Sequence, residues 1–370
     1  MLVIPCYSIS SNSVSLFSEL YYDNGNSFRT GNSSINKVTK FNHNKLSYQS
    51  RKKLERNINN MLLLANEKKC YNERTKSQFK FKLNFITLTL SSEQIHTDQF
   101  IKKHLLHQFI TELQQINPKV NYVWKAERQL NGNIHFHLVT DIYIHWNELR
   151  NKWNRIQEKY GYVSRYKESM KSFYKEGFKT NERYLKYSTI SKQREYYEKG
   201  IKTDWNNPNS TDIHSTKKVK DIASYMCKYM LKDMFNNHIR TKVGLFRPIQ
   251  SFKAKKREAM IERGLKAKVE TVSQNALKYL GKLADNGRIW AASYVIGKIK
   301  SVTKVLNNDI VSILQNLAKL KVIRSYSNKY STLYFFNPLT YLTNQLKIIT
   351  DEFFEYINCQ TGISLQLSLV

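Results

Sequence analysis

The chain has 370 residues and an ordinary apolar content, but its charges are far from balanced. Sixty Lys and Arg stand against 29 Asp and Glu, which gives a formal net charge of +31. So large an excess makes a polyanion the expected partner, with nucleic acid as the leading class. A basic membrane-surface protein is the competing class, but the sequence has no apolar run of about eighteen residues and no sustained basic amphipathic helix.

The cysteines and the first residues favour a reducing cytoplasm. The four cysteines are scattered without CxxC or zinc-finger spacing, so neither a disulfide framework nor a structural zinc site is expected. The short apolar run at residues 1–6 lacks a basic lead-in and contains Pro5, so it does not resemble a signal peptide.

Residues 1–78 are expected to form a basic N-terminal extension. The Ser, Asn and Gly content up to Ser34 predicts a loose or disordered segment. Residues 50–68 then predict a basic helix, because apolar residues recur at helical spacing. A DNA-contacting arm and a simple packing helix are equally open interpretations of this region.

A strand, a helix and a hairpin are predicted next. Residues 79–90 alternate as a strand that turns Ile86, Leu88 and Leu90 to the core, with Phe85, Thr87 and Thr89 on the other face. Residues 98–116 predict a helix capped by Asp98, and residues 120–129 and 134–142 predict two strands joined by a turn. The order β-α-β-β is the opening of a split βαβ, ferredoxin-like antiparallel sheet with helices on one face, in an α+β fold.

The second strand of this hairpin carries two histidines. Side chains alternate along a strand, so His135 and His137 share one face while Phe136 points to the other. Two neighbouring imidazoles can chelate a metal ion, although alternation alone is what any half-buried strand shows.

A carboxylate completes the candidate metal site. If the loop comprises residues 131–133, Glu127 lies opposite His137, whereas a two-residue loop turns Glu127 to the wrong face. Two imidazoles and one carboxylate suit Mn²⁺ or Mg²⁺, and zinc is compatible with the same ligand types.

A second group of functional residues is predicted on a later helix. Residues 146–160 predict a helix, and the charged, aromatic residues 161–216 are expected to form an insertion within the same domain. Residues 217–233 predict a helix that places Tyr225, Lys228, Tyr229 and Lys232 on one flank. Two tyrosines at this spacing usually pack, but a phenol beside a cation can also attack a phosphate.

In this order, the segments 85–89 (FITLT), 135–137 (HFH) and 225–232 (YMCKYMLK) resemble the HUH endonuclease superfamily. Within it they are similar to the rolling-circle replication initiators (Rep) of small circular single-stranded DNA phages and related plasmids. The pair of tyrosines is similar to the two-tyrosine, phage-type initiators. The resemblance spans about residues 79–235, which defines the expected endonuclease domain.

The resemblance implies a metal-dependent, site-specific DNA nicking and joining enzyme. His135, His137 and Glu127 would hold Mg²⁺ or Mn²⁺, and Tyr225 would attack the scissile phosphate to give a 5′-phosphotyrosine and a free 3′-hydroxyl. Tyr229 would act in the next cycle, when the strand is rejoined into a circle. Which tyrosine acts first is left open.

The same resemblance assigns supporting roles and partners. Lys228 would stabilise phosphate charge, and Thr87, Thr89 and Lys232 would contact DNA. Single-stranded DNA and origin DNA are the expected substrates, in the cytoplasm of a bacterial host. Because the sequence has no GxxxxGK[ST] loop, strand opening and synthesis would need a host helicase and polymerase.

Residues 236–370 are expected to be mainly helical. Residues 269–283, 290–306 and 310–320 show helical spacing, and residues 322–336 alternate like a basic hairpin. A winged-helix origin reader and a helical cap that supports the nuclease are the two interpretations, and the cap is preferred.

Two other classes of function fit the same residues. An HUH relaxase or transposase would use this site on another substrate, and cleavage of a double-strand origin rather than a hairpin end distinguishes them. A non-catalytic basic DNA-binding protein would need neither the metal nor the tyrosines, so a nicking assay separates it from both.

Overall fold

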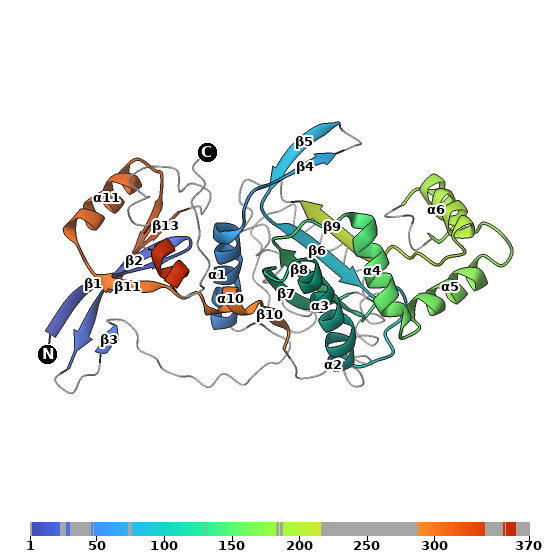
Figure 1. Ribbon diagram of the computed structural model, residues 1–370, viewed down its shortest axis with the longest axis horizontal. Coiled ribbons are helices and arrows are strands. Elements are labelled where there is room, and N and C mark those ends of the chain that lie inside the picture. Colours follow the sequence, from blue (N-terminus) through green and yellow to red (C-terminus); the bar gives the residue numbers. More distant parts are fainter. Residues whose placement is uncertain are drawn as a thin grey trace, which may run out of the picture.

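The computed structural model describes residues 2–22, 27–29, 46, 48–72, 76–129, 131–182, 185, 188–215, 288–336, 351 and 353–359. In these residues the fold is α+β, as predicted, with two antiparallel sheets and a separate two-stranded ribbon (Figure 1). Among the helices of the described part, none is both long and apolar enough to cross a membrane.

The five-stranded sheet, called here the histidine sheet, has the order β10-β7-β8-β6-β9. Strand β8 is antiparallel to both β6 and β7, so β6 and β7 are parallel and β8 lies between them. This is the predicted split βαβ arrangement. The strands are β6 (Asn84–Thr89), β7 (Tyr122–Arg128), β8 (Ile134–Thr140), β9 (Thr211–Ser215) and β10 (Trp290–Ala292).

The crossover from β6 to β7 is one continuous helical segment. It comprises α2 (Asp98–Phe100), the π-helical turn η1 (Ile101–Leu106) and α3 (His107–Ile116). Thr97 is the N-cap, because its side chain accepts a hydrogen bond from the backbone N–H of Phe100. The prediction of Asp98 as the cap is therefore wrong: Asp98 is fully buried and pairs with Arg128 instead.

The strand residues that point away from the histidines form the core beneath the helices. Ile86, Leu88, Phe136 and Leu138 are completely buried. Helices α3 and α4 (Trp146–Glu158) pack together over this sheet, as Figure 1 shows. The indole of Trp153 fixes α4 by donating a hydrogen bond to the backbone carbonyl of Thr89, at 2.7 Å.

Helices α5 (Tyr162–Phe173) and α6 (Ile190–Lys202) occupy the predicted insertion. Gly161 adopts φ +73 at the turn between α4 and α5, a conformation that glycine tolerates without strain. Contrary to the expectation that the insertion lacks a core, it has a small aromatic one: the Tyr174 and Trp205 rings stack at 5.2 Å.

The second sheet, called here the terminal sheet, joins the two ends of the chain. Its order is β11-β1-β2-β13-β12, with β3 also on β2. The prediction of a loose segment up to Ser34 is wrong for β1 and β2, whose buried side chains include Tyr7, Ile9 and Val14. The strands are β1 (Leu2–Ser10), β2 (Ser13–Tyr21), β3 (Ser27–Arg29), β11 (Val302–Val305), β12 (Arg324–Ser327) and β13 (Ser331–Phe335).

The predicted helix at residues 290–306 is also wrong. This stretch supplies β10 to the histidine sheet and β11 to the terminal sheet, with only the short helix α10 (Tyr294–Lys298) between them. Pairing with the edges of two sheets overrides the helical spacing of its apolar residues. Helix α11 (Asn308–Lys319) and the β12–β13 hairpin match the predictions, whereas residues 269–283 lie outside the described part.

Helix α1 (Tyr48–Leu64) forms where the sequence predicted a helix, and it contacts both β7 and α10. Its predicted apolar stripe is buried, since Leu54, Ile58, Met61 and Leu62 are each at most 1% exposed. Simple packing is thus the interpretation that the structure supports for this helix.

The predicted strand at residues 79–90 is divided in two. Strand β5 (Ser77–Phe81) pairs with β4 (Lys68–Asn72) in a separate ribbon, and β6 begins only at Asn84. Between them Leu83 is completely buried and Lys82 donates a hydrogen bond through Nζ to the carbonyl of Leu62 in α1. These contacts end one strand and start the next.

Candidate metal centre

The β7–β8 hairpin sets which side chains share the histidine face. Glu127 pairs with His135, and Lys125 pairs with His137. A backbone hydrogen bond from Gln129 N to Asn133 O extends the pairing beyond the strands, so the turn begins one residue earlier than predicted. The odd loop length and the placement of Glu127 on the histidine face are confirmed, but the predicted pairing of Glu127 with His137 is wrong.

Three donor atoms nevertheless converge. The Nε2 atoms of His135 and His137 are 3.0 Å apart. Glu127 Oε2 lies 3.0 Å from the Nε2 atom of His137 and 3.6 Å from that of His135. Although its strand partner is His135, Glu127 thus reaches diagonally to the nearer ring of His137.

These separations fit a metal ion. Ligand bonds of about 2.1 Å place neighbouring donors about 3.0 Å apart in an octahedron and about 3.4 Å apart in a tetrahedron. The Glu127, His135 and His137 group could therefore hold one divalent ion through three protein ligands. Its mixed N and O donors do not select one metal.

Neighbouring groups on β6 orient the His137 ring. Thr87 pairs with His137 across β6 and β8, and its hydroxyl lies 3.2 Å from His137 Nδ1. The Phe85 ring stacks on the same imidazole at 5.2 Å. Together they direct Nε2 toward Glu127, as the outer partners of ligating histidines generally do.

The protonation states also suit ligation. Burial raises the pKa of Glu127, but hydrogen bonds with His135 and His137 outweigh it and hold the pKa well below its ordinary value. Burial lowers the pKa of His137, although the hydrogen bond with Glu127 partly opposes this. A carboxylate and a neutral imidazole at neutral pH are the forms that bind metals.

Lys125 is a member of this face that the sequence reasoning missed. It is completely buried, lies opposite His137, and its charge contributes to the lowered pKa of His137. Its position two residues before Glu127, and therefore on the same face, was the available signal.

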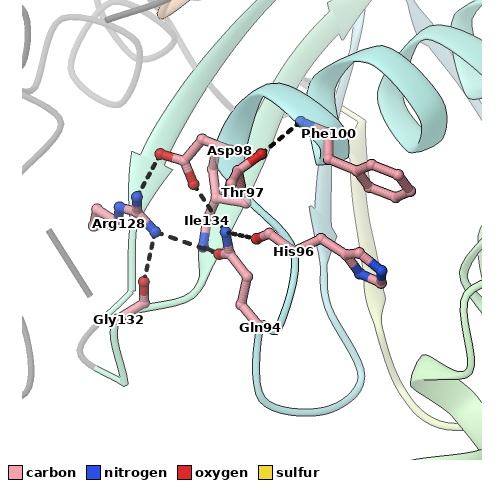
Figure 2. A network of polar contacts seen from close by, with 8 residues as sticks. All are labelled: Gln94, His96, Thr97, Asp98, Phe100, Arg128, Gly132 and Ile134. Carbon is pink, nitrogen blue, oxygen red and sulfur yellow. Dashed lines mark hydrogen bonds and ion pairs between the residues drawn. The ribbon is translucent and has the colours of Figure 1, made fainter. Parts of the chain in front are cut away.

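A buried polar network holds the turn beneath the ligands (Figure 2). The Arg128 guanidinium forms an ion pair with the buried Asp98 and donates to the carbonyl of Gly132, at 2.8 Å. Gln94 Oε1 accepts from the Ile134 backbone N–H at 2.7 Å, and Gln94 Nε2 donates to Asp98 at 2.9 Å. This network ties the start of α2 to both strands of the hairpin.

The sequence reasoning missed this network too. Arg128 follows Glu127 directly, so alternation turns its charge toward the core, where a buried partner is required. That requirement was the signal that could have identified Asp98 as an ion-pair partner rather than a cap.

The remaining predicted site residues are only partly described. Thr89 lies opposite His135, and its hydroxyl donates to the carbonyl of Ser210 at 2.8 Å. DNA contacts by Thr87 and Thr89 stay a prediction. The other four predicted residues lie outside the described part of the chain: Tyr225, Lys228, Tyr229 and Lys232.

Comparison with known families adds independent support. Residues 83–234 match the family model of the ORF2-type replication-associated proteins. No curated protein and no solved structure matches the chain. The matched region contains the three candidate ligands and the predicted tyrosine segment, and it supports a replication initiator.

Proposed function

We propose that the protein is a rolling-circle replication initiator that nicks one strand at an origin and later rejoins it into a circle. The observation that carries the proposal is the convergence of Glu127, His135 and His137 within a region matched by a replication-associated family. The high positive charge of the chain adds the attraction that a DNA substrate requires.

The three converging side chains would hold Mg²⁺ or Mn²⁺. When bound, the ion supplies Lewis acidity that polarises the scissile phosphate. Glu127 contributes negative charge, His135 and His137 contribute neutral donors, and Thr87 keeps the His137 ring in place. The buried Arg128 network keeps the hairpin that presents these ligands from shifting its register.

Tyr225 is the proposed nucleophile. Its phenolic oxygen forms a bond to phosphorus as the bond from phosphorus to the 3′ oxygen breaks. The phenolic proton is lost and the 3′ oxygen gains one, which leaves a 5′-phosphotyrosine and a 3′-hydroxyl primer. Lys228 would stabilise the phosphate charge, and Tyr229 would cleave the regenerated origin in the next cycle.

The described strands are compatible with this geometry. Ser215, on β9, is ten residues before Tyr225, and ten residues span at most about 35 Å. β9 is separated from β8 only by β6, and two strand spacings amount to about 10 Å. The chain is therefore long enough for Tyr225 to approach His137.

We extend the proposal to the organisation and partners of the chain. Residues 79–235 would form the endonuclease domain, with residues 1–78 as an N-terminal extension and residues 236–370 as a C-terminal region. Thr87, Thr89 and Lys232 would contact single-stranded DNA. A host helicase would open the duplex and a host polymerase would extend the primer, in the host bacterial cytoplasm.

Covalent capture tests this function. The protein is incubated with Mn²⁺ and a labelled random-sequence single-stranded DNA pool, and a denaturing gel detects the protein–DNA adduct. We expect mass spectrometry to map the adduct to Tyr225 or Tyr229. The variants Tyr225→Phe/Tyr229→Phe and His135→Ala/His137→Ala should both lose the adduct.

Tyr196→Phe is the matched control, because this tyrosine is 60% exposed on α6 and lies outside the proposed site. It should retain the full amount of adduct. An adduct that persists in the Tyr225→Phe/Tyr229→Phe variant would contradict the proposed chemistry.

A further inference from the structure

The ribbon formed by β4 and β5 has one face exposed to solvent. Lys69 pairs with Lys80, and Tyr71 pairs with Gln78, so these four side chains lie on the same face. All four are exposed; Tyr71 is 59% accessible. In Figure 1 the ribbon projects from the body of the molecule beside the histidine sheet.

The base of the ribbon is held firmly. Phe81 is 4% exposed, and its ring contacts that of Tyr143 at 5.9 Å. Just beyond it, Lys82 donates to the Leu62 carbonyl of α1. The ribbon can therefore present its exposed face in a fixed orientation, which lowers the entropy lost on binding.

The ribbon is strongly basic. Five lysines of the described residues 67–82 stand against the single acidic residue Glu67: Lys68, Lys69, Lys76, Lys80 and Lys82. Glu67 pairs with Lys80 at 2.8 Å, but both side chains are about half exposed. An exposed pair of this kind is weak, so a phosphate can replace the carboxylate.

Duplex DNA matches this shape and charge. The major groove is about 12 Å wide and admits a two-stranded antiparallel ribbon. Within it, the Gln78 amide could read an adenine edge, and Lys69 and Lys80 could read guanine or contact phosphates. Lysines on a ribbon also discourage pairing with other strands, and this is the competing explanation for their presence.

The ribbon is also connected directly to the candidate metal centre. After β5 the chain passes through two residues into β6, which carries Thr87 opposite His137. Six residues separate Phe81 from Thr87, an extended length of about 20 Å, which corresponds to about six base pairs.

We propose that the β4–β5 ribbon binds duplex DNA in the major groove, about half a helical turn from the nicked phosphate. The binding surface follows from the ribbon alone. Its role in placing the origin rests on the proposed nicking function.

Salt-dependent binding tests the surface. The full chain is titrated against a fluorescein-labelled duplex of about 30 mixed-sequence base pairs, between about 50 and 300 mM NaCl. The variant Lys69→Ala/Lys76→Ala/Lys80→Ala should bind more weakly, with a log–log salt slope smaller by about 2 to 3. The control Lys192→Ala/Lys199→Ala/Lys202→Ala removes the same charge from exposed positions on α6 and should keep the wild-type slope.

An unchanged slope in the ribbon variant, or an equal loss in the α6 control, would overturn the proposal and leave prevention of strand pairing as the explanation of the lysines. Equal weakening on a single-stranded probe of the same length would overturn the choice of duplex DNA. Circular dichroism verifies that each variant is folded.

The two proposals fail separately. The ribbon variant should still form the covalent adduct on single-stranded DNA, because it retains the ligands and the tyrosines. If the wild type forms no adduct but the ribbon variant loses duplex binding, the nicking function is wrong and the DNA-binding ribbon stands.

Discussion

The histidine sheet and the terminal sheet differ in what they bury. The histidine sheet encloses charged groups, namely Lys125, Glu127 and Arg128, each at most 5% exposed. The terminal sheet, in its described part, buries the polar residues Ser8 and Ser11, together with apolar side chains. Buried charges require partners at fixed positions, whereas an apolar core requires mainly volume and shape.

The two sheets also differ in how far apart their partners lie in sequence. In the histidine sheet all three candidate ligands lie within eleven residues of one hairpin, at positions 127, 135 and 137. In the terminal sheet Cys6 pairs with Val305. The comparison teaches that the candidate chemistry is built on local pairing, while the terminal sheet joins the ends of the chain.

The largest predicted effect is on the buried ion pair. Arg128→Met leaves the Asp98 carboxylate buried without its cation, which should lower the free energy of unfolding by about 3–5 kcal/mol. Urea denaturation measures the change. Lys80→Met breaks only the exposed pair with Glu67 and should change stability by less than about 1 kcal/mol.

The double variant Arg128→Met/Asp98→Leu removes both charges and should recover most of the lost stability, since apolar replacements of a buried pair are often neutral. If Arg128→Met were no more harmful than Lys80→Met, buried charge would not distinguish the histidine sheet.

Most of the histidine sheet could be predicted because its signals are local. Alternation fixed the faces of residues 84–89, 122–128 and 134–140, and the odd loop fixed the face of Glu127. The pairing was displaced by two residues because the bond between Gln129 and Asn133 moves the turn by one. Composition and periodicity do not encode that bond.

The terminal sheet could not be predicted in the same way. The partners of β1 and β2 lie about 300 residues later, and no local pattern links Cys6 to Val305. Residues 290–306 have helical spacing but complete two sheet edges, so tertiary pairing decides their structure. The position of Tyr225 relative to the ligands remains a prediction.

Matched truncations of the two cores give the next largest effect. Leu138→Ala and Ile9→Ala each remove a side chain that is at most 1% exposed, and each should cost about 2–5 kcal/mol of stability. Only Leu138→Ala should weaken Mn²⁺ binding in calorimetric titrations, because Leu138 adjoins the ligand His137 on β8. Equal Mn²⁺ affinity in both variants would show that the centre tolerates movement of its own strand.

Metal addition tests the same contrast without disturbing either core. Mn²⁺ at about 100 times its dissociation constant should raise the unfolding free energy by about 2.7 kcal/mol, and EDTA should reverse the gain. His135→Ala/His137→Ala should abolish it, whereas His145→Ala changes an exposed histidine outside the ligand group and should not. Hydrogen exchange should slow in β7 and β8 but not in β1 and β2; slowing confined to the terminal sheet would contradict the assignment of the centre.

The smallest predicted effect lies outside both sheets and asks whether the insertion has a specific core of its own. An added Cβ at Gly200 would lie 2.2 Å from the Trp205 ring, which stacks on Tyr174, so Gly200→Ala must displace the indole. Such overpacking costs about 1–3 kcal/mol. At Gly297 in α10, by contrast, an added Cβ meets nothing within 4 Å, and Gly297→Ala should stabilise by about 0.4–1 kcal/mol through the unfolded chain. Thermal unfolding followed by tryptophan fluorescence measures both changes. Because the Trp205 cluster is distant along the chain from the ligand hairpin, Gly200→Ala should leave Mn²⁺ affinity intact, and a loss of affinity would mean that the insertion supports the histidine sheet directly.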